Sequence, residues 1–187
     1  GAVPWAFDLA GCAQLTVKAL TLGGAVSLGD EGAAAIAAAL RNNSALERMH
    51  LLSTGISIEG AVALAGALES NDALYTLDLE YNPLQPEGVS ALARALVHNR
   101  RLTTLRLAYC EAGAEGAAAL GDALERNDVL QHLNLGYSQI GVSGAAELAR
   151  ALVRNRALET LDLWHNALGD DGAAALAPAV NDSALSS

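Results

Sequence analysis

The chain has 187 residues, of which 52% are hydrophobic, 4% aromatic and 17% charged. This length corresponds to one domain or slightly more, and alanine and leucine rather than large rings must supply its core. Eleven Lys and Arg residues stand against 21 Asp and Glu residues, for a formal net charge of -10, which disfavours nucleic acid as a partner because phosphate binding depends on cationic side chains.

The sequence also disfavours several other classes of protein. Cys12 and Cys110 are too few and too far apart for a disulfide framework or a zinc site, so we expect a reducing, cytoplasmic compartment. Lys18 is the only lysine, and no phosphate-binding loop surrounds it. Because no run of about 18 apolar residues and no basic start occur, we expect neither a membrane span nor a secretion signal. We expect no cofactor.

In chain order, residues 1–16 come first and are predicted to form an N-terminal cap, with Trp5 and Phe7 covering the first repeat. A pattern with a period of 28 residues follows, opened by Leu46, Leu74, Leu102, Leu130 and Leu158. An earlier copy begins at Val17 and contains one extra residue. We therefore predict six repeats over residues 17–185, with starts near 17, 46, 74, 102, 130 and 158, and a tail at 186–187.

Each copy is predicted to form a strand, a turn and a helix. The opening alternation of buried leucines, as in Leu74, Leu77 and Leu79, indicates a short strand with one buried face. After a glycine, apolar residues recur at helical spacing among alanines, as in Val89, Leu92 and Leu96. A lone strand and helix cannot bury their apolar faces, so the copies are expected to stack into one continuous core.

Two further columns of residues mark the turns. Small or amide side chains follow each strand and are expected to donate hydrogen bonds to backbone carbonyls; they are Thr54, Asn82, Cys110, Ser138 and Asn166. An asparagine ends each helix, where we expect the left-handed conformation; these are Asn43, Asn71, Asn99, Asn127 and Asn155.

Stacked strands lie about 4.8 Å apart, whereas packed helices need about 8 to 10 Å. The predicted fold is therefore α/β: a curved solenoid with a parallel sheet on the concave side and helices on the convex side. The repeats resemble the leucine-rich repeat family, and the 28-residue unit with L-G-D-x-G-A-x-A-L-A, read at Leu168 to Leu176, resembles its ribonuclease-inhibitor-like subclass. This resemblance implies protein binding through the concave face and the adjoining rim.

Strand residues that alternate with the buried leucines should face the concave side. They include three of the four tyrosines, which is more than core packing requires. We expect these rings either to bind a partner protein or to stack on one another. The candidate protein-binding residues are Tyr81, Tyr109, Tyr137, Trp164, His165, His50, Asp78, Glu80, Arg106, His132, Asn134 and Asp162.

The search for catalytic chemistry gives no site. The histidines lie on different repeats, and Cys110, which could be paired with His132 as a nucleophile, occupies the turn column instead. The leading hypothesis is a non-enzymatic protein-binding scaffold. The alternatives are an acidic inhibitor of a basic enzyme and a GTPase-activating protein similar to the Ran activators. Because the last repeat lacks a polar cap, we also expect either a piece of a longer chain or a neighbouring subunit covering its edge.

Overall fold

The computed structural model describes residues 17–24 and 27–182. The predicted N-terminal cap with Trp5 and Phe7, together with Cys12 and residues 183–187, lies outside the described residues. Strands and helices alternate along the described chain: β1 (Ala19–Gly23), α1 (Gly29–Leu40), β2 (Arg48–Leu52), α2 (Ile58–Leu68), β3 (Thr76–Asp78), α3 (Gln85–His98), β4 (Thr104–Arg106), α4 (Gly113–Leu124), β5 (His132–Asn134), α5 (Gly141–Leu152), β6 (Thr160–Asp162) and α6 (Gly169–Asp182).

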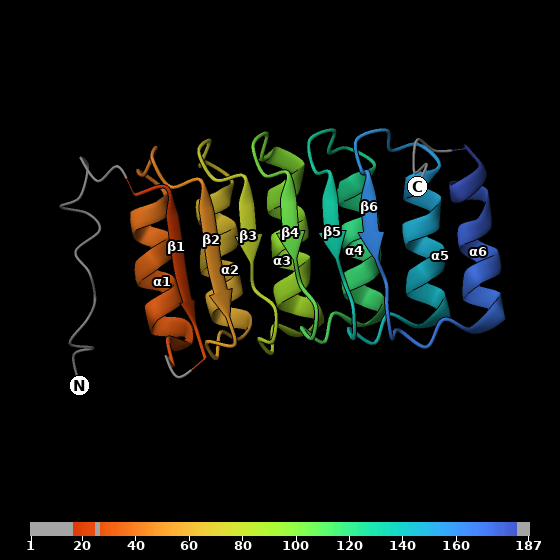
Figure 1. The fold of residues 1–187 in the computed structure, drawn as a ribbon, viewed down its shortest axis with the longest axis horizontal. Coiled ribbons are helices and arrows are strands. Elements are labelled where there is room, and N and C mark those ends of the chain that lie inside the picture. Colours follow the sequence, from red (N-terminus) through yellow and green to blue (C-terminus); the bar gives the residue numbers. More distant parts are fainter. Residues whose placement is uncertain (1–16, 25–26, 183–187) are drawn as a thin grey trace.

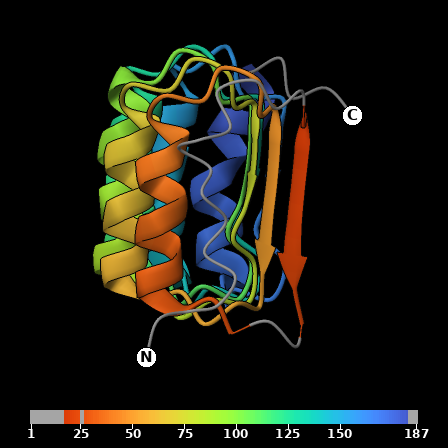
Figure 2. The same ribbon diagram turned by 90° about the vertical axis from the view of Figure 1, so that its left-hand side faces the viewer.

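The strands form one parallel sheet in the order β1-β2-β3-β4-β5-β6. Equivalent positions of successive repeats lie side by side, as in Leu77 beside Leu105 and Leu105 beside Leu133. The helices form a second layer behind the sheet (Figures 1 and 2). In Figure 1 the row of helices extends further than the row of strands, so the solenoid bends with its sheet on the concave side. The predicted fold is confirmed.

Between the two layers lies a continuous leucine and alanine core. Met49, Leu77, Leu105 and Leu133 of the strands are buried against Leu64, Leu92, Leu120 and Leu148 of the helices. Every buried side-chain nitrogen and oxygen of the described residues has a hydrogen-bond partner. Across the same residues, no helix combines the length and the apolar character needed to cross a membrane.

The turn column behaves as predicted. Its side chains donate to backbone carbonyls of their own or the preceding repeat: Thr54 Oγ1 and Asn82 Nδ2 to Leu51, Cys110 Sγ to Leu79, Ser138 Oγ to Leu107 and Asn166 Nδ2 to Leu135. These bonds satisfy carbonyls that would otherwise be buried without a partner.

The helix-end asparagines correct one expectation. None of them has a positive φ; Asn99, for example, has φ -70° and ψ 130°. Its side chain instead links two repeats, donating to Leu68 O (2.7 Å) and Asn71 O (3.0 Å) and accepting from the amides of Arg101 and Leu102. The left-handed prediction was wrong because the amide of asparagine satisfies these backbone groups from an extended backbone.

Candidate functional site

The candidate site is a ladder of rings at the end of the strands. The aromatic ladder consists of Tyr81, Tyr109, Tyr137 and His165, each three residues beyond the end of its strand. Successive ring centroids are 4.3, 4.2 and 4.3 Å apart, with interplanar angles of 13°, 14° and 8°. These spacings follow from the strand spacing, because each ring belongs to the next strand of a parallel sheet in strict register.

The backbone explains why these rings leave the strand pattern. Tyr81, Tyr109, Tyr137 and His165 have φ values of 60°, 58°, 53° and 55°, which lie in the left-handed region that residues with side chains rarely adopt. Strand alternation ends there, so the ladder projects from the rim where strands turn into helices rather than from the sheet itself. Sequence alternation had placed these side chains on the concave surface of the strands.

Trp164 completes the ladder. Its ring packs edge-on against Tyr137, with centroids 5.1 Å apart at 88°, and against His165, with centroids 4.2 Å apart at 80°. Its backbone amide donates to Asp162 Oδ1 at 2.9 Å, which holds the turn in place. Despite these contacts, the side chains remain accessible: Tyr81 is 50%, Tyr109 37% and Trp164 65% exposed.

The environment of Tyr109 keeps its phenol uncharged. Reduced hydration, and then the phenols of Tyr137 and Tyr81 on either side, raise the pKa of Tyr109 to about 12. A phenol is already uncharged at physiological pH, and the raised pKa extends the uncharged state of Tyr109 toward pH 12. Neutral aromatic faces carry a partial negative charge that attracts cations.

A polar network lies on the concave face beside the ladder. Arg106 Nε contacts Glu80 Oε1 at 2.8 Å and Asp78 Oδ2 at 3.6 Å, and Asn134 Nδ2 donates to the same Glu80 oxygen at 2.9 Å. His50 Nδ1 lies 3.4 Å from Asp78 Oδ2. The hydrogen bond to Glu80 raises the pKa of Arg106, and burial of the guanidinium opposes this increase. The network joins four successive repeats.

Burial distinguishes the members of this network. Asp78 and Glu80 are each only 6% exposed, whereas Arg106 is exposed. The carboxylates are thus occupied by internal partners, and Arg106 is the part of the network that another molecule can reach. Of the two carboxylates, Glu80 is the closer partner of Arg106 and Asp78 is the more distant one.

The remaining predicted site residues are spread along the concave face. His132 Nδ1 lies 2.8 Å from Thr160 Oγ1 on the neighbouring strand, and Asp162 belongs to the exposed last strand. The described residues contain no group of three or more His, Cys, Asp or Glu side chains arranged to hold a metal ion. Cys110 is fully buried, and desolvation raises its pKa to about 12, which keeps it an unreactive thiol.

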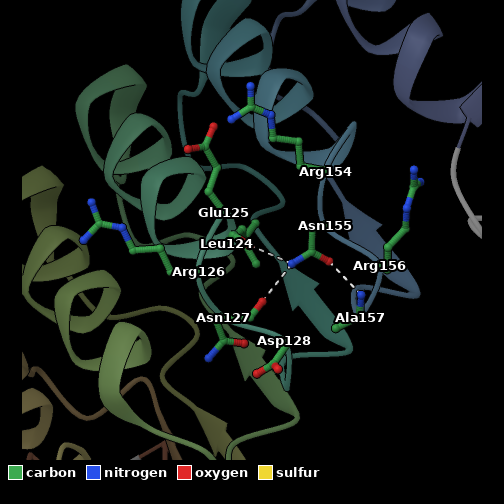
Figure 3. A pocket seen from close by; sticks show the side chains of 9 residues that line it. All are labelled: Leu124, Glu125, Arg126, Asn127, Asp128, Arg154, Asn155, Arg156 and Ala157. Atoms are coloured by element: carbon green, nitrogen blue, oxygen red, sulfur yellow. Dashed lines mark hydrogen bonds between the residues drawn. The ribbon is translucent and has the colours of Figure 1, made fainter.

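A depression on the opposite edge was not predicted from the sequence. It has a volume of about 390 Å³ and is lined by Arg126, Asp128, Arg154, Arg156 and neighbouring residues at the ends of α4 and α5 (Figure 3). Within it, Asn155 donates to the carbonyls of Leu124 and Asn127 and accepts from the amide of Ala157. The recurrence of asparagine every 28 residues is the sequence feature that marks this edge. The side-chain amide of Asn155 is fully engaged in hydrogen bonds to the backbone.

Comparisons with known proteins agree with the geometry. A family model described as leucine-rich repeat matches residues 74–93, 98–121, 126–149 and 154–177. No curated protein sequence matches. Among solved structures, the chain is similar to actin-binding site 2 of leiomodin-1, with 20% identity and a TM-score of 0.69 over 80% of this chain and 86% of that chain.

A second similar structure is the tropomodulin C-terminal domain of Caenorhabditis elegans, with 20% identity and a TM-score of 0.64. The match covers 79% of this chain and 92% of that domain. At this level of identity the likeness concerns the fold. Six stacked strand-helix units with the family's leucine pattern lead to one conclusion: the chain belongs to the leucine-rich repeat family.

Proposed function

We propose that this protein is a non-enzymatic scaffold that binds a partner protein through its concave face and the aromatic ladder. The observation that carries the proposal is the ladder with Trp164: three tyrosines and a tryptophan, all outside the core, lie on one rim of the molecule. Tyrosine and tryptophan are enriched among the residues that dominate binding energy at interfaces.

Stacking alone accounts for only part of this arrangement. A stacked pair contributes about 0.5 to 1.5 kcal/mol beyond its buried area, but Tyr81 has one face without a stacked ring among the described residues and is 50% exposed. The positive φ does not require these rings either, because Ser53 in the same column has a φ of 52° without a ring. A binding role supplies the missing reason for large exposed side chains at these positions.

The last repeat of the described chain leaves part of its apolar surface uncovered. Leu161, Leu163, Leu168 and Leu176 of the last repeat are only partly buried, unlike their equivalents in the central repeats. A neighbouring subunit seated against β6 and α6 would cover them. We propose that such a subunit binds the last repeat. We also propose that the protein is cytoplasmic and that its repeats are of the ribonuclease-inhibitor-like subclass.

The test immobilises three forms of the protein, the wild type and two variants, and compares the proteins that each form retains from an extract of the source organism. Replacing Tyr81, Tyr109 and Tyr137 by asparagine removes the rings but retains a residue that tolerates positive φ. The control replaces exposed valines away from the ladder edge, Val62 within α2 and Val153 at the end of α5, by alanine. We expect a protein retained by the wild type and the valine variant to be lost from the tyrosine variant.

Circular dichroism must show equal helix content in all three forms. Retention of the same protein by the tyrosine variant would exclude the ladder as the binding surface. Actin is the first defined probe, because the similar leiomodin-1 structure is named for an actin-binding site. Loss of activity of a basic enzyme on addition of the purified protein would instead favour the alternative function, an acidic inhibitor of such an enzyme.

A further inference from the structure

The aromatic ladder is incomplete at one end. One face of Tyr81 stacks on Tyr109, and among the described residues no ring or guanidinium group covers the other face. The next position of the same column is Ser53, which is exposed and has a φ of 52°, as the ladder residues do. A planar group placed above Ser53 would therefore continue the stack by one step.

Trp164 offers a second open ring surface. It meets Tyr137 and His165 through edge contacts near 90°, so neither of these rings stacks on a face of the indole. It is also the most exposed aromatic side chain of the described residues, at 65%. Both ends of the ladder thus present aromatic surface on which a planar side chain can stack.

The strand-to-helix connections that carry the ladder contain charged side chains of one sign. The ladder lies on the edge where strands connect to helices, at the bottom of Figure 1. The connections, residues 23–32, 53–60, 81–88, 109–116, 137–144 and 165–172, contain neither Lys nor Arg. They contain eight carboxylates, and all but Asp30 are exposed: Asp30, Glu31, Glu59, Glu87, Glu111, Glu115, Asp170 and Asp171.

Helix dipoles do not cancel this charge. Six helices begin at the same edge, and each contributes about half a positive charge at its N-terminus, or about three in total. The carboxylates still exceed that value. The arginines lie outside these connections. Arg106 is on the concave face beside the ladder, where it is paired with Glu80, and the opposite edge carries Arg41, Arg100, Arg101, Arg126, Arg154 and Arg156.

We propose that the ladder edge recognises arginine side chains of the partner, one guanidinium stacking on the open face of Tyr81 above Ser53 and another on Trp164. Arginine meets both requirements at once, because its guanidinium is planar and stacks on rings while carrying the charge that the edge attracts. The lysine ammonium carries the same charge and is attracted to ring faces, but it is not planar and cannot stack on them. This inference rests on the proposed function and specifies the chemistry of the partner surface.

The test uses two dye-labelled peptides of equal charge, Gly-Arg-Gly-Arg-Gly and Gly-Lys-Gly-Lys-Gly, titrated with the protein and followed by fluorescence anisotropy. We expect the wild type to bind the arginine peptide about two- to fivefold more tightly. Replacing Tyr81, Tyr109 and Tyr137 by asparagine together with Trp164→Ala leaves no tyrosine or tryptophan face of the described residues open at this edge, and should reduce this ratio to about one while leaving salt-dependent binding of both peptides. Equal binding of both peptides by the wild type would overturn the inference.

Two charge variants separate the ring contribution from the charge contribution. Glu87→Gln with Glu111→Gln and Glu115→Gln should weaken both peptides equally and preserve their ratio. Glu69→Gln with Asp72→Asn, which removes exposed carboxylates from the opposite edge, should change neither affinity. A partner lost with the three tyrosines but lacking any arginine preference would refute this inference alone and leave the proposed function intact.

Discussion

Asn99 shows how much of this fold depends on single side chains. It is 3% exposed, and its side-chain amide makes four hydrogen bonds, two to the preceding repeat and two to the backbone of Arg101 and Leu102, which follow it in the chain. Asn99→Ala would leave four backbone groups without partners. We expect a loss of about 2 to 4 kcal/mol in the free energy of unfolding, measured by urea denaturation.

Asn42 provides the matched control for Asn99. It also follows a helix, but its side chain is exposed. Asn42→Ala should change stability by no more than about 0.5 kcal/mol. If the two substitutions had equal effects, the hydrogen bonds between repeats would not contribute to stability.

Tyr109 gives a prediction about alkaline pH. Its pKa in the folded protein is about 12, against an ordinary value of 10.0. The unfolded chain loses the phenol proton first, so the stabilising contribution is complete below pH 10 and is lost as pH rises toward 12. Tyr109→Phe should therefore lose less stability than the wild type over this interval, as followed by urea denaturation at several pH values. Equal losses would show that the phenol is not protected by its neighbours.

At the scale of single residues, the sequence predicted correctly those side chains that bond their own or the preceding repeat. It predicted that Cys110 and Ser138 replace asparagine as turn donors, and the structure confirms this. It did not predict the burial of Glu80, because that depends on Asn134, 54 residues later in the chain. It also missed the positive φ of the tyrosines, since nothing in the residue type favours that conformation.

At the scale of elements, neighbouring helices approach closely at a recurring glycine. A Cβ atom added to Gly144 would lie 2.7 Å from Ile140 Cγ2 and 2.9 Å from Ala117 Cβ of the preceding helix. The glycine that sequence analysis used as a marker of helix starts is therefore required by packing between α4 and α5. Strand and helix positions follow from periodicity, whereas this spacing follows only from the packed structure.

Gly144→Ala should destabilise the protein by about 1 to 3 kcal/mol in urea denaturation, because the added methyl group overpacks the contact. Gly66 is the contrasting case, because a Cβ atom added there would lie no closer than 3.5 Å to its nearest neighbour, Arg41 Nη2, which is an ordinary contact. Gly66→Ala should stabilise α2 by about 0.5 to 1 kcal/mol through helix propensity alone. Effects of the same sign would contradict the packing explanation.

At the scale of the whole molecule, each helix packs on the helices before and after it in the chain, and each strand pairs likewise. Stability is then a sum of repeat and neighbour contributions. We expect amide hydrogen exchange to be slowest in β3, β4 and β5 and faster in β6 and α6, whose outer side meets no other element of the described chain. Uniform protection would indicate a single cooperative unit instead.

The recurrence of the asparagine bonds at intervals of 28 residues has an evolutionary consequence. Because Asn71, Asn99, Asn127 and Asn155 each reach back to the equivalent atoms one unit earlier, a duplicated unit brings with it the groups needed to join both flanks. The gene can therefore gain or lose whole repeats without requiring a new kind of contact between neighbours. Selection can then change the length of the ladder edge without changing the architecture that supports it.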